Sequence, residues 1–187
     1  MTKELKWASI ALVALVVIWG INSLMQNRHV TKTGEVFDVE KDDVWEVTIS
    51  KDNESITLVR TGDSWTIAGN DSLVMKSGRI DNLFSKTLAV KRETMISSNP
   101  TKWATYSVDD SLGSFIQVKD VAQKELASAI FGRSSSDWSH NYVRTSGEDE
   151  VYLTNENVVY TLNTSPKYWG EIPKPPKPDT TATNPFE

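Results

Sequence analysis

The sequence predicts an α+β fold in which a single-pass N-terminal transmembrane helix precedes an antiparallel β-sheet domain with one or two packed helices. Three observations lead to this prediction. Residues 7–25 form one uncharged apolar run. Several short segments further on alternate apolar and polar residues, which is the period of half-buried antiparallel strands. Residues 80–88 instead space their apolar side chains three and four apart, as an amphipathic helix does.

The apolar run has the length of a membrane-spanning helix. About 19 residues at about 1.5 Å per residue give roughly 28 Å, close to the hydrocarbon thickness of a bilayer. We therefore expect an uncleaved signal anchor. Its expected membrane contacts are Trp7, Leu12, Leu15, Val16, Ile18, Trp19, Ile21 and Leu24.

The charges around the run say little about its orientation. Lys3 and Lys6 precede it, and Arg28 and Lys32 follow it, so the positive-inside rule only leans towards an inside amino terminus. A cleaved signal peptide would also fit the charged start, but no pair of small residues stands at cleavage spacing. A buried core helix would need a second long apolar helix, and none follows. We expect an inner-membrane protein whose C-terminal domain lies outside the cytoplasm.

The composition of the chain limits the classes of partner that we expect it to bind. The formal net charge of −5 and the absence of a basic stripe argue against nucleic acid. The chain has no cysteine, which removes disulfides, thiol catalysis and zinc-thiolate sites. The expected partners are the lipid bilayer and a protein of a membrane or envelope complex. The predicted parts are a signal anchor at residues 1–27, a stalk at 28–34, an α+β domain at 35–170 and a proline-rich disordered tail at 171–187.

The first half of the domain predicts an initial strand and then a three-stranded meander. In residues 44–50, Trp45, Val47 and Ile49 fall on one face. The predicted strands are residues 35–39, 44–50, 56–60 and 65–67, with turns at 52–53 and 61–63.

The amphipathic helix at residues 80–88 follows, and Ser77 is placed to cap its start. Its apolar stripe is expected to pack on the sheet face that carries Trp45 and Trp65. A second helix start is predicted at residues 97–100, because Pro100 is favourable in a first turn.

The second half of the domain returns to strands. The predicted strands are residues 115–119, 141–145, 151–154 and 157–162, and residues 91–96 are expected to be extended. Residues 125–131 are compatible with either a strand or a helix.

No group of residues predicts catalysis or metal binding. Ser134, Ser135 and Ser136 with Asp137 and His140 contain the residue types of an acyl-transfer triad, but no strand-elbow-helix context surrounds them. The acidic pairs lack the spacing and central glycine of a calcium loop. We therefore expect no catalytic residue, no metal and no cofactor, and we interpret residues 134–140 as a polar loop.

The tryptophans are the best candidates for binding. Trp45 and Trp65 lie in phase with the apolar side of their strands and are expected in the core. Trp103, Trp138 and Trp169 lie in or beside loops, where an indole can contact a protein or a sugar, although packing within the fold is the favoured interpretation of all three. Phe186, near the end of the tail, is a further candidate contact. Arg144 is expected to be solvated or paired.

Several segments together resemble a known family. They are residues 44–49, residues 56–60 with Gly62 and Trp65, the helix at 80–88, residues 103–108 before Asp109, Gly132, and residues 142–144 leading to 151–153. Over residues 40–165 this pattern is similar to the bacterial domain of unknown function 4340. The resemblance implies a membrane-anchored extracytoplasmic protein. Some members are encoded beside transporter components of the gliding-motility auxiliary type, which implies an accessory role in envelope transport.

The leading prediction is a non-enzymatic accessory or scaffold protein that presents its domain to a protein partner. The alternative is a glycan- or peptidoglycan-binding module that uses surface tryptophans. A third hypothesis, from another class, is a hydrolase that uses His140.

Overall fold

The computed structural model describes residues 12–18, 33–134 and 137–173. Contacts divide the chain into two units, residues 1–32 and 33–187. In the first unit residues 12–18 are helical, and Leu12, Leu15, Val16 and Ile18 are exposed. The other predicted anchor contacts, Trp7, Trp19, Ile21 and Leu24, lie outside the described residues, as does the tail from residue 174. None of the described helices has the length and apolar character needed to cross a membrane.

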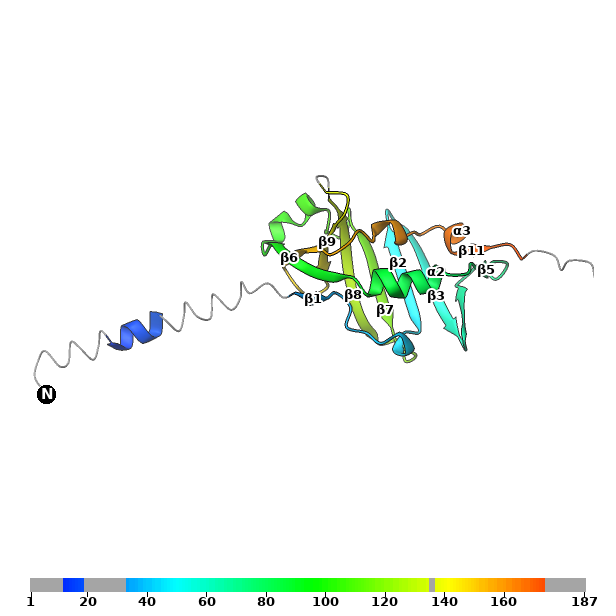
Figure 1. Cartoon of the computed structure of the whole chain (residues 1–187), viewed down its shortest axis with the longest axis horizontal. Helices are drawn as coiled ribbons and strands as arrows, with labels where there is room; N and C mark the ends of the chain where they lie inside the picture. The colour runs from blue at the N-terminus through cyan, green and yellow to red at the C-terminus, as the bar shows by residue number, and fades with distance from the viewer. Residues whose placement is uncertain (1–11, 19–32, 135–136, 174–187) are drawn as a thin grey trace, which may run out of the picture. The chain divides into compact units, whose positions relative to one another are not determined.

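The second unit is built on a nine-stranded antiparallel sheet, as far as the described residues show (Figure 1). Its strand order is β1-β6-β10-β9-β8-β7-β2-β3-β4. The strands are β1 (Gly34–Glu35), β2 (Glu46–Lys51), β3 (Glu54–Thr61), β4 (Ser64–Ile67), β6 (Lys91–Ser97), β7 (Ser114–Lys119), β8 (Glu125–Arg133), β9 (Asn141–Thr145) and β10 (Val151–Thr154). A separate pair joins β5 (Val74–Met75) to β11 (Gly170–Glu171). The predicted antiparallel sheet with few helices is confirmed.

Two meanders make up most of the sheet. Strands β2, β3 and β4 form one, β7 to β10 form the other, and β2 pairs with β7 to join them. Strands β6 and β1 extend the sheet beyond β10. Asp52 and Asn53 both have positive φ in the β2–β3 turn, which short polar residues tolerate. Residues 125–131, left open by the sequence, belong to strand β8, because they pair with β7 on one side and β9 on the other.

A helical segment crosses one face of the sheet and leads from the first meander to β6 (Figure 1). It consists of α2 (Arg79–Asn82) and the π-helical η2 (Leu83–Leu88), so the predicted helix is present. Leu83 and Leu88 are buried, and the Phe84 ring meets Trp65 edge to face at 5.9 Å. The predicted cap is wrong, because Gly78, with φ 74°, precedes the helix and no side chain caps it.

The core lies between this helical segment, residues 158–169 and the facing side of the sheet. Val47 and Ile49 of β2 are fully buried beside Ile116 and Val118 of β7, as the alternation predicts. Trp45, expected in the core, is only half-buried, and the Arg60 guanidinium lies 5.7 Å from its ring centroid. The guanidinium covers one face of the indole, so the ring is packed although it stays partly exposed.

Residues 100–113 cover the other face of the sheet over β7 to β10. They begin with η3 (Pro100–Lys102), where the Asn99 side chain accepts a hydrogen bond from the Thr101 amide, and continue with η4 (Ala104–Tyr106). Val108 packs with Ile130 and Val151 in a second buried cluster. The predicted helix start near Pro100 is confirmed in place, although the turns are 3₁₀.

Two predicted strands differ from the structure. Residues 157–162 form η5 (Val159–Thr161), because the Asn141 Oδ1 atom accepts the amides of Val158 and Val159 and bends the chain into a turn. Of residues 35–39, only Glu35 pairs in a strand. Val36 and Phe37 leave the strand and are buried in the core.

Gly132 allows η4 to lie directly against β8. A Cβ atom at this position would stand 2.0 Å from the Tyr106 carbonyl oxygen and 2.8 Å from that of Ser107. Both neighbours are backbone atoms, so neither can move aside as a flexible side chain would. The contact therefore requires glycine.

We expect Gly132→Ala to lower the free energy of unfolding by about 3 kcal/mol or more, because the new methyl group overlaps backbone. Urea unfolding of the full chain measures this. The control is Gly69→Ala, where φ is +73° but nothing lies within 4 Å of the new atom. That variant should lose only about 1 kcal/mol, the cost of a left-handed conformation. Equal losses in the two variants would contradict the close approach.

Candidate functional site

Five segments of the described residues line a pocket of about 640 Å³. They are the end of η4, the end of β8, the β8–β9 loop, the start of β9, and η5 with the residues just before it. The lining residues are Ser107, Arg133, Ser134, Trp138, Asn141, Asn157, Val159 and Tyr160. We call this the Trp138 pocket.

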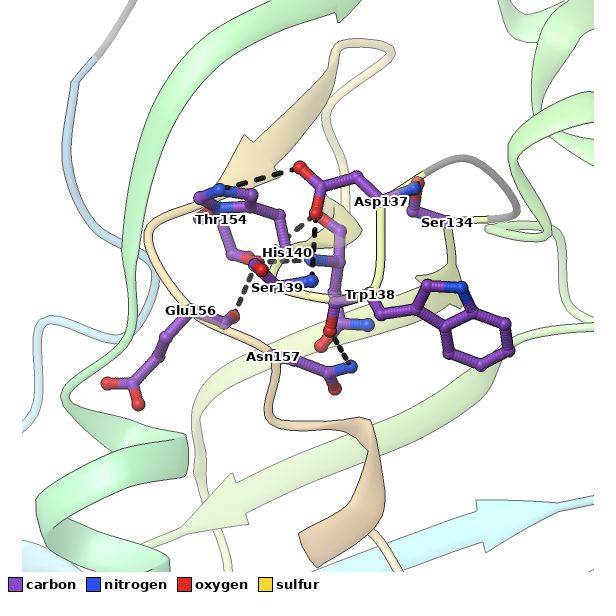
Figure 2. A network of polar contacts seen from close by, with 9 residues as sticks. Ser134, Asp137, Trp138, Ser139, His140, Thr154, Glu156 and Asn157 are labelled. Atoms are coloured by element: carbon purple, nitrogen blue, oxygen red, sulfur yellow. Dashed lines mark hydrogen bonds and ion pairs between the residues drawn. The ribbon is translucent and has the colours of Figure 1, made fainter.

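The β8–β9 loop is held by its own polar groups (Figure 2). The Asp137 amide donates to Ser134 Oγ at 3.0 Å, and the Ser139 amide donates to Asp137 Oδ1 at 2.8 Å. The Trp138 carbonyl accepts from Asn157 Nδ2 at 2.8 Å. The backbone of Trp138 is therefore fixed on both sides, while its indole points away from the network and is 79% exposed (Figure 2).

His140 is the last residue of this loop. Its Nδ1 atom lies 2.7 Å from the Thr154 carbonyl oxygen, and its Nε2 atom lies 3.5 Å from Asp137 Oδ2. Since a carbonyl can only accept, Nδ1 carries the proton. Both ring nitrogens thus face partners other than a serine hydroxyl. Ser135 and Ser136 lie outside the described residues. The arrangement joins the described part of the loop to β10.

Asn141 fixes the opposite wall. It is 1% exposed, and its Oδ1 accepts from the Val158 amide at 2.6 Å and the Val159 amide at 3.1 Å. The Asn141 amide in turn donates to Thr154 Oγ1 at 2.8 Å. These bonds set the first turn of η5, which buries Val159 and leaves Tyr160 57% exposed at the pocket.

A family model described as a domain of unknown function, DUF4340, matches residues 65–171, more than half of the chain. The chain belongs to this family. The match runs from β4 to β11 and includes every residue that lines the Trp138 pocket. It confirms the family that the sequence resembled. Neither the curated proteins nor the solved structures contain a significant match to the chain.

The tryptophans proposed as contacts within the DUF4340 domain differ in how far they are exposed. Trp103 is half-buried: its Nε1 donates to the Asp149 carbonyl at 3.0 Å, and the Arg144 guanidinium covers its ring at 3.9 Å from the centroid. Trp169 is 1% exposed, and its Nε1 donates to the Asn163 carbonyl at 2.6 Å. Trp169 therefore belongs to the core and not to the surface.

Of the three candidate tryptophans, Trp138 alone offers a free indole. Phe186 lies outside the described residues. Two exposed residues beside Trp138, Arg133 and Tyr160, were not among the predicted contacts. Tyr160 falls in the middle of residues 157–162, which were predicted to be a strand. No sequence pattern indicates that it lies near Trp138.

The Asp109 carboxylate accepts the hydrogen bonds of a turn. Burial disfavours the ionised form of Asp109, but hydrogen bonds from the Leu112 amide and from the Ser111 hydroxyl and amide outweigh it. Together with the nearby Arg144 charge, they hold the pKa of Asp109 below its usual range. Among the described residues, no three His, Cys, Asp or Glu side chains are grouped so that they could hold a metal ion.

We expect Trp169→Ala to lower the free energy of unfolding by about 3–5 kcal/mol, because it removes a buried indole and its hydrogen bond. Trp138→Ala should stay within about 0.5 kcal/mol of the unmodified chain, because the lost side chain faces solvent. Urea unfolding of both full-length variants measures the difference. A comparable loss in Trp138→Ala would show that its indole packs in the fold.

Proposed function

We propose that the chain is a membrane-anchored, non-enzymatic accessory protein that presents its DUF4340 domain outside the cytoplasm to a protein partner of an envelope complex. The observation that carries the proposal is the uncharged run at residues 7–25, directly ahead of a folded sheet domain. A run of about 19 apolar residues is long enough to span a bilayer.

The open edges of the sheet support a protein partner. Strand β1 pairs only with Lys91 and Arg92 of β6, so residues 93–97 have a strand neighbour on the β10 side alone within the described part of the chain. The opposite edge is β4, which pairs with β3. An open strand edge can accept a strand from another protein through main-chain hydrogen bonds. Ile96 is 37% exposed on the β6 edge and can add an apolar contact.

The geometry of His140 supports a binding role over a hydrolytic one. Its two ring nitrogens are held by the Thr154 carbonyl and the Asp137 carboxylate. A general base must reach the proton that it removes, whereas the imidazole in this position joins its own loop to the end of β10.

The anchor is tested by placing one charge in the run. We expect Leu15→Arg to shift part of the protein from the membrane pellet to the supernatant, because an arginine at the centre of a spanning helix costs about 2.5–3.5 kcal/mol. The control Leu112→Arg changes an exposed leucine of the sheet domain and should stay in the pellet. Extraction of the unmodified full-length chain by alkaline carbonate would reject the anchor, and protection of the domain from protease outside spheroplasts would reject its location.

The partner is tested with a photoreactive amino acid at Ile96, on the β6 edge. We expect one cross-linked adduct of defined mass with an envelope protein, because a strand added to this edge lies next to residue 96. Position Val121, an exposed valine between β7 and β8, is the matched control and should give no such adduct. A second probe at Thr66 examines the β4 edge. The absence of an adduct from both edges in cells would contradict strand addition.

A further inference from the structure

We propose that the Trp138 pocket binds an acidic saccharide. The ligand would be a sugar that carries a carboxylate, held between the exposed Trp138 and Tyr160 rings and the Arg133 guanidinium. This inference goes beyond the proposed function, which concerns a protein partner at the sheet edges. It does not depend on the anchor.

The exposed aromatic side chains are the first part of the argument. Trp138 is 79% exposed and Tyr160 is 57% exposed, and both line one pocket. Trp45, Trp65, Trp103 and Trp169 are all buried or half-buried. Burying an aromatic ring removes a large apolar area from water, so an indole held in solvent by a fixed backbone forgoes that stabilisation. A ligand with an apolar face would provide it, and the C–H face of a pyranose ring is such a face.

The lining suits a ligand that has both an apolar face and polar groups. Most of its exposed surface is apolar, while four of the eight lining residues carry a hydroxyl or an amide, namely Ser107, Ser134, Asn141 and Asn157. Val159 is the only aliphatic lining residue among those described. Ser134, Asn141 and Asn157 each make a hydrogen bond within the fold, and the half-buried Ser107 adds a hydroxyl to the lining. Amide and hydroxyl groups can make more than one hydrogen bond, so a saccharide hydroxyl can still pair with this lining. A pocket of about 640 Å³ lies within the usual size range for a small ligand.

The charge of the lining indicates the type of sugar. Arg133 is exposed and is the single charged residue among the described lining residues. The nearest acidic group of the loop, Asp137, directs its carboxylate to His140 and to the Ser139 amide (Figure 2). A guanidinium binds a carboxylate through two parallel hydrogen bonds. The pocket therefore favours a carboxylated sugar over a neutral one.

Isothermal titration of the full chain, in a detergent without a sugar headgroup, tests this. The probes are an oligogalacturonate, a maltooligosaccharide of equal length as the neutral control, and a peptide-free disaccharide of N-acetylglucosamine and N-acetylmuramic acid, whose lactyl carboxylate is free. We expect the acidic probes to bind more tightly than the neutral one, and we expect their affinity to fall as salt is added, because an ion pair is screened. The oligogalacturonate and muramic acid probes separate a uronic acid from a cell-wall source of the carboxylate.

Variants assign the binding to the pocket. We expect Trp138→Ala to weaken binding of the acidic probe by about tenfold or more, since one stacked ring is lost. Arg133→Gln should remove the preference for the acidic probe and leave the affinity for the neutral one unchanged. The controls are Leu112→Ala and Lys102→Gln, which change an exposed leucine and an exposed cation elsewhere, and both should bind as the unmodified chain does.

Three results would overturn the proposal. They are no binding of any probe up to about 10 mM, equal binding by Trp138→Ala and the unmodified chain, or a preference for the neutral probe. None of them bears on the proposed function, which is tested by membrane extraction and by cross-linking at the sheet edge.

Discussion

Because Gly132 has no side chain, the Tyr106 carbonyl occupies the space where a Cβ atom would lie, and residues 100–113 rest directly on β8. Much of the domain depends on this approach. It closes the second cluster of Val108, Ile130 and Val151 over a sheet face that would otherwise meet solvent. It also brings Ser107 beside Arg133, and so forms one wall of the Trp138 pocket. A packing constraint and a candidate binding site thus share one glycine.

Arg144, on strand β9, binds residues 100–113 to the sheet. Its side chain is 8% exposed, its Nε donates to the Val108 carbonyl at 3.0 Å, and its Nη2 lies 3.1 Å from Asp110 Oδ1. The Trp103 ring covers the guanidinium face. Burying a charge costs less when it is paired: here a carbonyl and a carboxylate accept hydrogen bonds from Nε and Nη2, and the aromatic face offsets part of the positive charge. This explains why Trp103 belongs to the architecture, whereas the sequence had offered it as a contact for a ligand.

The parts of the fold that could be predicted are those in which burial follows local sequence. The buried alternation at Val47 and Ile49 was predicted correctly, and so was the turn at Asp52 and Asn53. Both features depend on residues that are close together in the sequence. The error at residues 157–162 has a tertiary cause. The alternating pattern there is real, but the Asn141 side chain accepts two of its amides and bends the chain into η5. No local pattern encodes a hydrogen bond between residues so far apart in the chain.

The candidate site was harder to predict for the same reason. The sequence identified three tryptophans beside loops, but their exposure is set by partners from other segments. The Asn163 carbonyl and the core enclose Trp169, Arg144 covers Trp103, and nothing comparable covers Trp138 among the described residues. The pocket also needs Tyr160, which the sequence placed on a strand.

The difference between the two proposed interactions has a physical consequence for affinity. If residues 7–25 hold the domain at the envelope, a saccharide in the same layer is present at a high local concentration. A pocket with one ion pair can then be occupied even if its affinity is modest. Strand addition at the β6 edge involves main-chain hydrogen bonds over several residues and can be more durable. The exposed indole of Trp138 would then serve a reversible contact, while the sheet edge holds the partner. The Asn157–Trp138 bond supports this division, because a restrained backbone leaves only the rotamers of the indole to be ordered on binding.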